Sequence, residues 1–155
     1  TRDLLTALHD LRVPVQEVTV AEFASAADTD SPQGILAIAE IPKRDLSEVA
    51  FADGADARIV VLDAVQDPGN VGTIVRTAAA LGAAATLSLP GTVDLWNAKV
   101  VRSSMGALFH APAVACTWAE FDAFRSRNDV ELWGAEAGGE PLSVVARDRS
   151  AIPPR

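Results

Sequence analysis

The sequence has little cysteine and no long apolar run. Cys116 is the only cysteine among the 155 residues, so no internal disulfide can form. It stands in the apolar run 113–116, and we expect a small, buried core residue there. No apolar run approaches the roughly 20 residues that span a membrane, and the N-terminus lacks a basic-then-apolar signal pattern. These absences predict a cytoplasmic protein with no membrane partner.

Histidine is scarce too. His9 and His110 are far apart in the sequence, and no carboxylate pair stands at ligand spacing around either, so we predict no metal site. What remains is 49% hydrophobic and 22% charged, which is typical of a globular protein. A chain of 155 residues is long enough for one domain with a core, or for one domain and part of another.

Positive charge is in short supply, and the formal net charge is −8. This balance argues against a broad nucleic-acid-binding face, because phosphate binding depends on clustered lysine and arginine. The cations that are present are mostly arginine, eleven against two lysines, and arginine suits bidentate contact with phosphate. RNA affinity would therefore lie in a separate domain or in a dimer groove.

The chain is organised around residues 58–82. The β-branched run 58–63 predicts a buried parallel strand, and a Pro-Gly turn follows it at 68–69. Asn70 stands at the expected N-cap of a helix that ends near Gly82, with Arg76 on its outer side. The apolar residues predicted on the inner side recur at helical spacing: Val71, Ile74, Val75, Ala78 and Leu81. The result is a βα unit whose turn opens at the carboxyl edge of a sheet, where such sheets bind ligands.

A second strand and helix follow directly. Residues 83–91 predict a strand that completes a βαβ unit, and Asp94 or Thr92 is the expected cap of the next helix. That helix is predicted to point four apolar side chains inward, namely Trp96, Val100, Val101 and Met105. Its C-terminal end carries small and polar residues together with one arginine: Arg102, Ser103, Ser104 and Gly106.

The remaining segments predict a mostly parallel sheet with helices on both faces. Further strands are expected at 13–18, 34–42, 113–116 and 130–135. Helices or helical turns are expected at 3–11, 20–25, 46–51 and 118–125, the last with Trp118, Phe121 and Phe124 in the core. The polar, turn-rich segment 27–34 is the expected domain boundary.

The pattern Asn-x-Gly-x-Ile-x-Arg-Thr-Ala at 70–78, followed by Lys-Val-Val-Arg-Ser-Ser-Met-Gly-Ala at 99–107, resembles the SpoU family. These are RNA ribose 2′-O-methyltransferases, TrmH-like members of the knotted SPOUT class that use S-adenosylmethionine. The resemblance implies an α/β SPOUT fold, S-adenosylmethionine as cofactor, and RNA as partner, with ribosomal RNA favoured over transfer RNA. It also implies a homodimer.

The resemblance also implies roles for individual residues. Arg76 would act on the ribose 2′-hydroxyl, and Asn70 would position Arg76 or the loop before it. Because arginine seldom loses its proton in a protein, Arg76 is better suited to stabilising the developing alkoxide and holding the adjacent phosphate. Substrate contacts would come from Arg102, Ser103 and Ser104. Cofactor contacts would come from Leu89, Gly91 and Gly106.

The implied domain organisation has three parts. Residues 1–26 would be the end of an L30e-like RNA substrate-binding domain, 27–34 a linker, and 35–155 a SPOUT methyltransferase domain. Family members continue with a glycine loop, an Ile-Pro segment and a Ser-Leu-Asn block that build the trefoil knot and much of the cofactor pocket. We expect the SPOUT domain to be incomplete at its C-terminus, with weak or absent cofactor binding.

Two other interpretations stay open. The first is a non-catalytic RNA-binding or dimerisation fragment of such an enzyme. The second is a Rossmann-type nucleotide-binding enzyme, which would also show a strand, a glycine turn and a helix. That class needs Gly-x-Gly-x-x-Gly, whereas residues 67–72 supply two glycines with a proline before the first.

Overall fold

The computed structural model describes residues 2–27, 32–49, 51, 57–135 and 138–139. Contacts divide the chain into two compact units, Thr1–Glu40 and Ile41–Arg155, and each is described by itself. The sequence placed the end of the linker at residue 34, whereas this division falls after Glu40. The assignment of the first part to an RNA substrate-binding domain remains a prediction.

The first unit contains two short helices, α1 (Arg2–Asp10) and α2 (Val20–Ala26). Both were expected. Thr19 begins α2 with a capping box, in which its hydroxyl accepts from the backbone N–H of Glu22 and the Glu22 carboxylate accepts from the backbone N–H of Thr19. The strands expected at 13–18 and 34–42 are wrong: the described residues of both segments are irregular. Alternating apolar residues favour a strand only where a neighbouring strand supplies hydrogen-bond partners.

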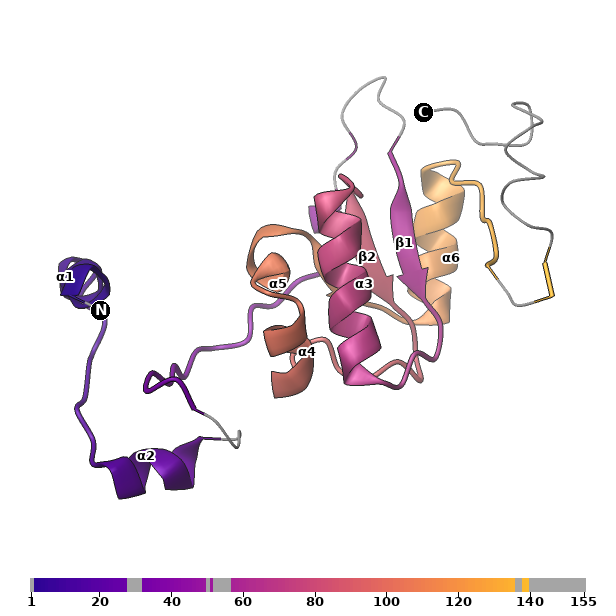
Figure 1. The fold of residues 1–155 in the computed structure, drawn as a ribbon. Helices are drawn as coiled ribbons and strands as arrows, with labels where there is room; N and C mark the ends of the chain where they lie inside the picture. Colours follow the sequence, from indigo (N-terminus) through magenta and orange to yellow (C-terminus); the bar gives the residue numbers. More distant parts are fainter. Residues whose placement is uncertain (1, 28–31, 50, 52–56, 136–137, 140–155) are drawn as a thin grey trace. The chain divides into compact units, whose positions relative to one another are not determined.

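The described residues of the second unit form a parallel three-stranded sheet in the order β1-β2-β3. Figure 1 labels β1 and β2, with α3 on one side and α6 on the other. The strands are β1 (Ile59–Leu62), β2 (Ala85–Ser88) and β3 (Ala113–Ala115). Ile59 pairs with Ala85 and Thr86 with Ala113, which confirms the predicted parallel βαβ arrangement. The strand expected at 130–135 is wrong, because these residues form no regular element.

Three helices cover one face of the sheet: α3 (Pro68–Ala80), α4 (Ala98–Ser103) and α5 (Ala107–His110). They bury a core with the side chains that β1 and β3 turn toward them. Its fully or almost fully buried members are Leu62, Val71, Val75, Leu95, Val100, Leu108 and Ala113. Trp96 and Val101 pack against this core as predicted. The inward positions predicted for Leu81 and Met105 are wrong, since these side chains are 81% and 75% exposed.

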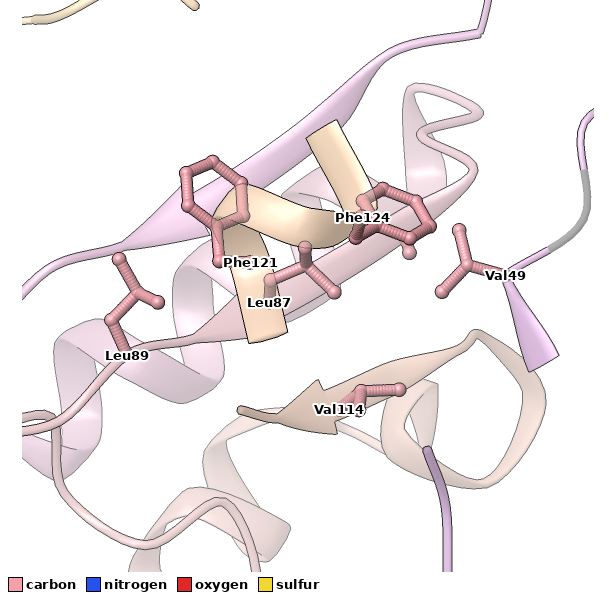
Figure 2. Close-up of a cluster of buried hydrophobic side chains, with 7 residues drawn as sticks. Val49, Leu87, Leu89, Val114, Phe121 and Phe124 are labelled. Atoms are coloured by element: carbon pink, nitrogen blue, oxygen red, sulfur yellow. The ribbon is translucent and has the colours of Figure 1, made fainter. Parts of the chain in front are cut away.

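The opposite face is covered by α6 (Trp118–Arg127) and by the short 3₁₀ turn η1 (Leu46–Glu48). Leu87 and Leu89 are two residues apart, so both project to this face, where Phe121 and Phe124 of α6 meet them (Figure 2). The prediction of helices on both faces is therefore confirmed. Trp118 is 47% exposed, so its predicted place in the core is wrong.

Candidate functional site

The N-cap of helix α3 is Asp67, three residues before the N-cap that the sequence indicated. The Asp67 carboxylate accepts a hydrogen bond from the backbone N–H of Asn70 at 2.7 Å, and Pro68 occupies the first helical turn. Proline fits there because its missing N–H would have no partner inside the helix. Asn70 is thus not the N-cap but the third residue of the helix. Its side chain is left free of the capping role.

The outer side of α3 carries Asn70 and Arg76, and both side chains are exposed. Within the part of the chain that the structure describes, neither makes a side-chain hydrogen bond or an ion pair. They are six positions apart in the sequence, so they do not face one another on the helix. The structure therefore shows no direct contact through which Asn70 would orient Arg76. Both catalytic assignments remain predictions.

Helices α3 and α4 approach each other at Gly72 and Ser103. A Cβ atom built on Gly72 would lie 1.9 Å from Ser103 Oγ and 2.7 Å from the Val100 carbonyl oxygen, so only glycine fits. Ser103 Oγ lies 2.7 Å from the carbonyl oxygen of Lys99 and 3.1 Å from that of Pro68. The Ser103 hydroxyl therefore links α4 to the first turn of α3. The two motifs meet at this close contact between the Gly72 backbone and α4.

The other motif residues lie at the end of α4. Ser104 is fully buried and donates a hydrogen bond to the Val101 carbonyl at 2.8 Å, whereas Arg102 is exposed. Gly106 adopts a left-handed conformation, with φ of 89°, between α4 and the unpredicted helix α5. Asn97 caps α4, so the expected cap at Asp94 or Thr92 is wrong; Asp94 instead accepts from the N–H of Trp96. The substrate roles of Arg102, Ser103 and Ser104 remain predictions.

The carboxyl ends of β2 and β3 border a shallow, open depression. Its residues after β2 include Leu89, Pro90 and Asp94, and its residues after β3 include Cys116 and Glu120. The full lining is Ser88, Leu89, Pro90, Thr92, Asp94, Leu95, Ala115, Cys116, Thr117 and Glu120. Leu89 has only 2% of its surface exposed, so it forms the floor. The depression combines an apolar floor with carboxylates at its rim.

The predicted site residues are not gathered in one place. Leu89 lines the depression, and Gly91 lies in the same loop against Ala64. Neither Arg76 nor Gly106 is among the residues that line it. The sequence reasoning missed the role of Asp67, although an Asp directly before Pro-Gly is a helix-start signal.

Two titratable groups at the depression, Cys116 and Glu120, have pKa values shifted from their ordinary values. Burial, and then the charge of Glu120, raise the pKa of the Cys116 thiol, which keeps the thiol neutral and a poor nucleophile. Hydrogen bonds from the backbone and hydroxyl of Thr117 lower the pKa of the Glu120 carboxyl. Glu120 therefore stays anionic, and Cys116 serves as a packing residue rather than a reactive one. No group of three or more His, Cys, Asp or Glu side chains suited to a metal ion occurs among the described residues.

Charge is distributed unevenly along the chain. Between residues 68 and 119 the only formally charged residues are Arg76, Asp94, Lys99 and Arg102, in a chain of net charge −8. The three cations are exposed and lie on α3 and α4. The helical face that carries both motifs is therefore positive, whereas the acidic residues lie mainly elsewhere. No helix among the described residues is long and apolar enough to cross a membrane.

Two solved structures of RNA methyltransferases share this arrangement. An AdoMet-bound rRNA methyltransferase from Sinorhizobium meliloti matches 84% of this chain and 58% of its own length, with 26% identity and a TM-score of 0.64. A structure described as an RNA 2′-O ribose methyltransferase matches 73% of this chain and 43% of its own, with 33% identity and a TM-score of 0.58. These matches identify the fold of this chain as that of an α/β RNA methyltransferase.

The family follows from the sequence comparison. Residues 57–152 match the SpoU rRNA Methylase family, and the chain belongs to that family. The 23S rRNA (guanosine(2553)-2′-O)-methyltransferase RlmP of Bacillus subtilis is 32% identical over 144 residues, which cover 91% of this chain and 55% of that protein. The chain spans about half the length of this relative.

Proposed function

We propose that this chain belongs to a protein that transfers a methyl group from S-adenosylmethionine to a ribose 2′-hydroxyl of RNA, ribosomal RNA before transfer RNA. The observation that carries the proposal is the free guanidinium of Arg76, exposed on the positive α3–α4 face within the family motif. The names of the relatives support the same reaction: RlmP is a 23S rRNA 2′-O-methyltransferase. A substrate of this kind favours the cytoplasm as the location.

Arg76 is suited to hold negative charge at the reacting ribose. Methyl transfer to a hydroxyl needs that hydroxyl held close and in line, and charge develops on its oxygen as the proton leaves. A guanidinium with no partner among the described residues can donate to that oxygen and to the neighbouring phosphate at once. The proton would pass to water or phosphate, since arginine does not release its own.

The depression beside β2 fits S-adenosylmethionine chemically. Its apolar floor at Leu89 suits an adenosine, and the rim carboxylates of Asp94 and Glu120 suit the positive sulfonium and ammonium groups. Leu89 would contact the cofactor there, and Gly91, which lies in the same loop, would contact it from beside the depression. When bound, S-adenosylmethionine supplies an electrophilic methyl group. The left-handed Gly106 is a further proposed contact, from the turn between α4 and α5.

A homodimer is part of the proposal. Arg76 is not among the residues that line the depression, so a single copy does not present the guanidinium inside it. A second copy that placed its α3 beside the depression would bring Arg76 to the cofactor. Arg102, on the same positive face, would contact the RNA phosphates.

Substitution of Arg76 tests the proposal. In the full-length protein, Arg76→Ala should lower transfer of labelled methyl groups from S-adenosylmethionine to RNA by about 10²–10³-fold, as expected for loss of a group that stabilises developing charge. Circular dichroism and calorimetric affinity for S-adenosylmethionine should stay unchanged. Arg127→Ala, which removes an exposed arginine from α6, is the matched control and should keep full activity. Near wild-type turnover in Arg76→Ala would refute the assignment.

A further inference from the structure

Thr92 joins the two loops that leave β1 and β2. Its hydroxyl donates a hydrogen bond to the Leu62 carbonyl oxygen at 3.1 Å and accepts one from the backbone N–H of Val65 at 3.3 Å. The residues that it bridges lie at the end of β1 and in the loop that leads to α3. Only a side chain with both a donor and an acceptor can make this pair of contacts, which threonine and serine can and valine cannot.

Other contacts make the junction of the two loops tight. The Val93 N–H donates to the Val65 carbonyl at 3.0 Å, and the Leu89 N–H donates to the Leu62 carbonyl at 2.9 Å. A Cβ atom on Gly91 would lie 3.2 Å from Ala64 Cβ. Ala64 itself has a φ of 53°, a left-handed conformation that a non-glycine residue adopts only when its surroundings hold it there. The bridging hydroxyl thus sits beside a strained backbone.

The junction connects two parts of the site proposed above. The loop after β1 continues through Asp67 into α3, the helix that carries Arg76. The loop after β2 contains Leu89 and Gly91, the proposed cofactor contacts. We propose that Thr92 is a positioning residue that fixes the β1–α3 loop against the β2–α4 loop and so sets the geometry between cofactor and arginine. This inference rests on the proposed function; Thr92 also lines the depression, and the positioning role is carried by its two hydrogen bonds to the β1–α3 segment.

Three full-length variants test the role of Thr92. Thr92→Val keeps the shape and removes both hydrogen bonds, so kcat should fall by about 10–100-fold, the scale of a misplaced reacting group. Thr92→Ser retains the hydroxyl and should recover activity to within about threefold. Val49→Ala removes core volume on the α6 face, away from both loops, and controls for lost stability. It should leave kcat within about twofold at temperatures where every variant is folded.

Two further measurements do not depend on turnover. Hydrogen exchange of the Val65 amide should quicken about tenfold or more in Thr92→Val and stay as in the wild type in Thr92→Ser and Val49→Ala. Calorimetric affinity for S-adenosylmethionine should fall severalfold in Thr92→Val alone. Unchanged kcat, exchange and affinity in Thr92→Val, or equal losses in Thr92→Ser and Thr92→Val, would overturn the inference. A wild-type protein without methyl transfer would refute the proposed function instead, and exchange and affinity would still decide on Thr92.

Discussion

The two faces of the sheet are packed by different means. On the α6 face, large side chains fill the space: Leu87 and Val114 from the strands meet Phe121 and Phe124 from the helix (Figure 2). On the α3 face, Leu95, Leu108 and Val100 are buried too, but a close helix contact is added, where Gly72 lies directly against Ser103. Large side chains hold α6 on its face, whereas the missing Cβ of Gly72 lets α3 and α4 lie in direct contact. The face that carries the motif residues is therefore the one on which two helices approach each other most closely.

This difference between the faces bears on where the cationic motif residues lie. The inner sides of α3 and α4 are occupied by core residues and by the Gly72–Ser103 contact, so Arg76, Lys99 and Arg102 lie on exposed positions of the two helices. Helix α6 on the opposite face carries both signs of charge, the carboxylates Glu120 and Asp122 near its start and Arg125 and Arg127 in its last turn. Substitutions on the two faces should therefore differ in effect. A core substitution on the α6 face should mainly lower the free energy of unfolding, whereas one at the α3–α4 contact should also displace the two helices.

Truncation of a core phenylalanine should have the largest effect on stability. Phe124 is 2% exposed and contacts Phe51 with a ring-centroid distance of 5.8 Å. Phe124→Ala should lower the free energy of unfolding by about 3–5 kcal/mol, because it leaves a cavity. Chemical denaturation would measure the loss. Trp118→Ala, on the same helix but 47% exposed, should cost much less, and equal costs would contradict this account of the α6 face.

A methyl group at the α3–α4 contact should have the next largest effect. Gly72→Ala should lower the free energy of unfolding by about 1–3 kcal/mol through overpacking against Ser103 and the Val100 carbonyl. Denaturation midpoints would measure it. Gly134→Ala is the control, since a Cβ there meets nothing within 4 Å.

The second variant at this contact separates overpacking from a helix-propensity effect. Ser103→Gly removes two of the three atoms that the new methyl group would meet, so it should partly restore the stability of Gly72→Ala. Alanine favours a helix over glycine, which alone would stabilise Gly72→Ala. A stabilised Gly72→Ala protein would therefore refute the close-contact interpretation of the α3 face.

The sequence predicted the sheet better than the segments outside it. Runs such as 58–63 and 113–116 form strands with helices on both faces of their sheet, and their β-branched or small residues match a parallel strand. Residues 13–18 and 130–135 show strand-like patterns as well, yet they remain irregular, because pairing depends on a neighbour that the local pattern does not contain. Helix α5 escaped prediction because a single turn of four residues carries too little periodicity.

The sequence identified individual residues of the candidate site but not their arrangement in space. The motif identified Arg76 and its exposure, since helical spacing puts it opposite Val71 and Val75. The pattern could not give the Thr92 bridge, because its partners lie 27 and 30 residues away. Nor could it reveal that Ser104 is fully buried, because burial depends on the packing of residues distant in the sequence.

The start of α3 offers the smallest and most discriminating change. Asp67 caps the helix, so Asp67→Ala should lower the free energy of unfolding by about 1 kcal/mol, through loss of the cap and of a negative charge at the helix N-terminus. Asn70→Ala should change it by less than about 0.5 kcal/mol, as for an exposed helical side chain. Thermal denaturation of both variants would measure the difference, with Asp67→Asn as a control that keeps a capping oxygen. If Asn70→Ala proved the more destabilising of the two, Asn70 rather than Asp67 would be the cap, and α3 would begin where the sequence pattern first placed it. A stable Asn70→Ala protein with reduced methyl transfer would instead assign the exposed amide to the chemistry of the site, because a residue free of the capping role has no other task in the described structure.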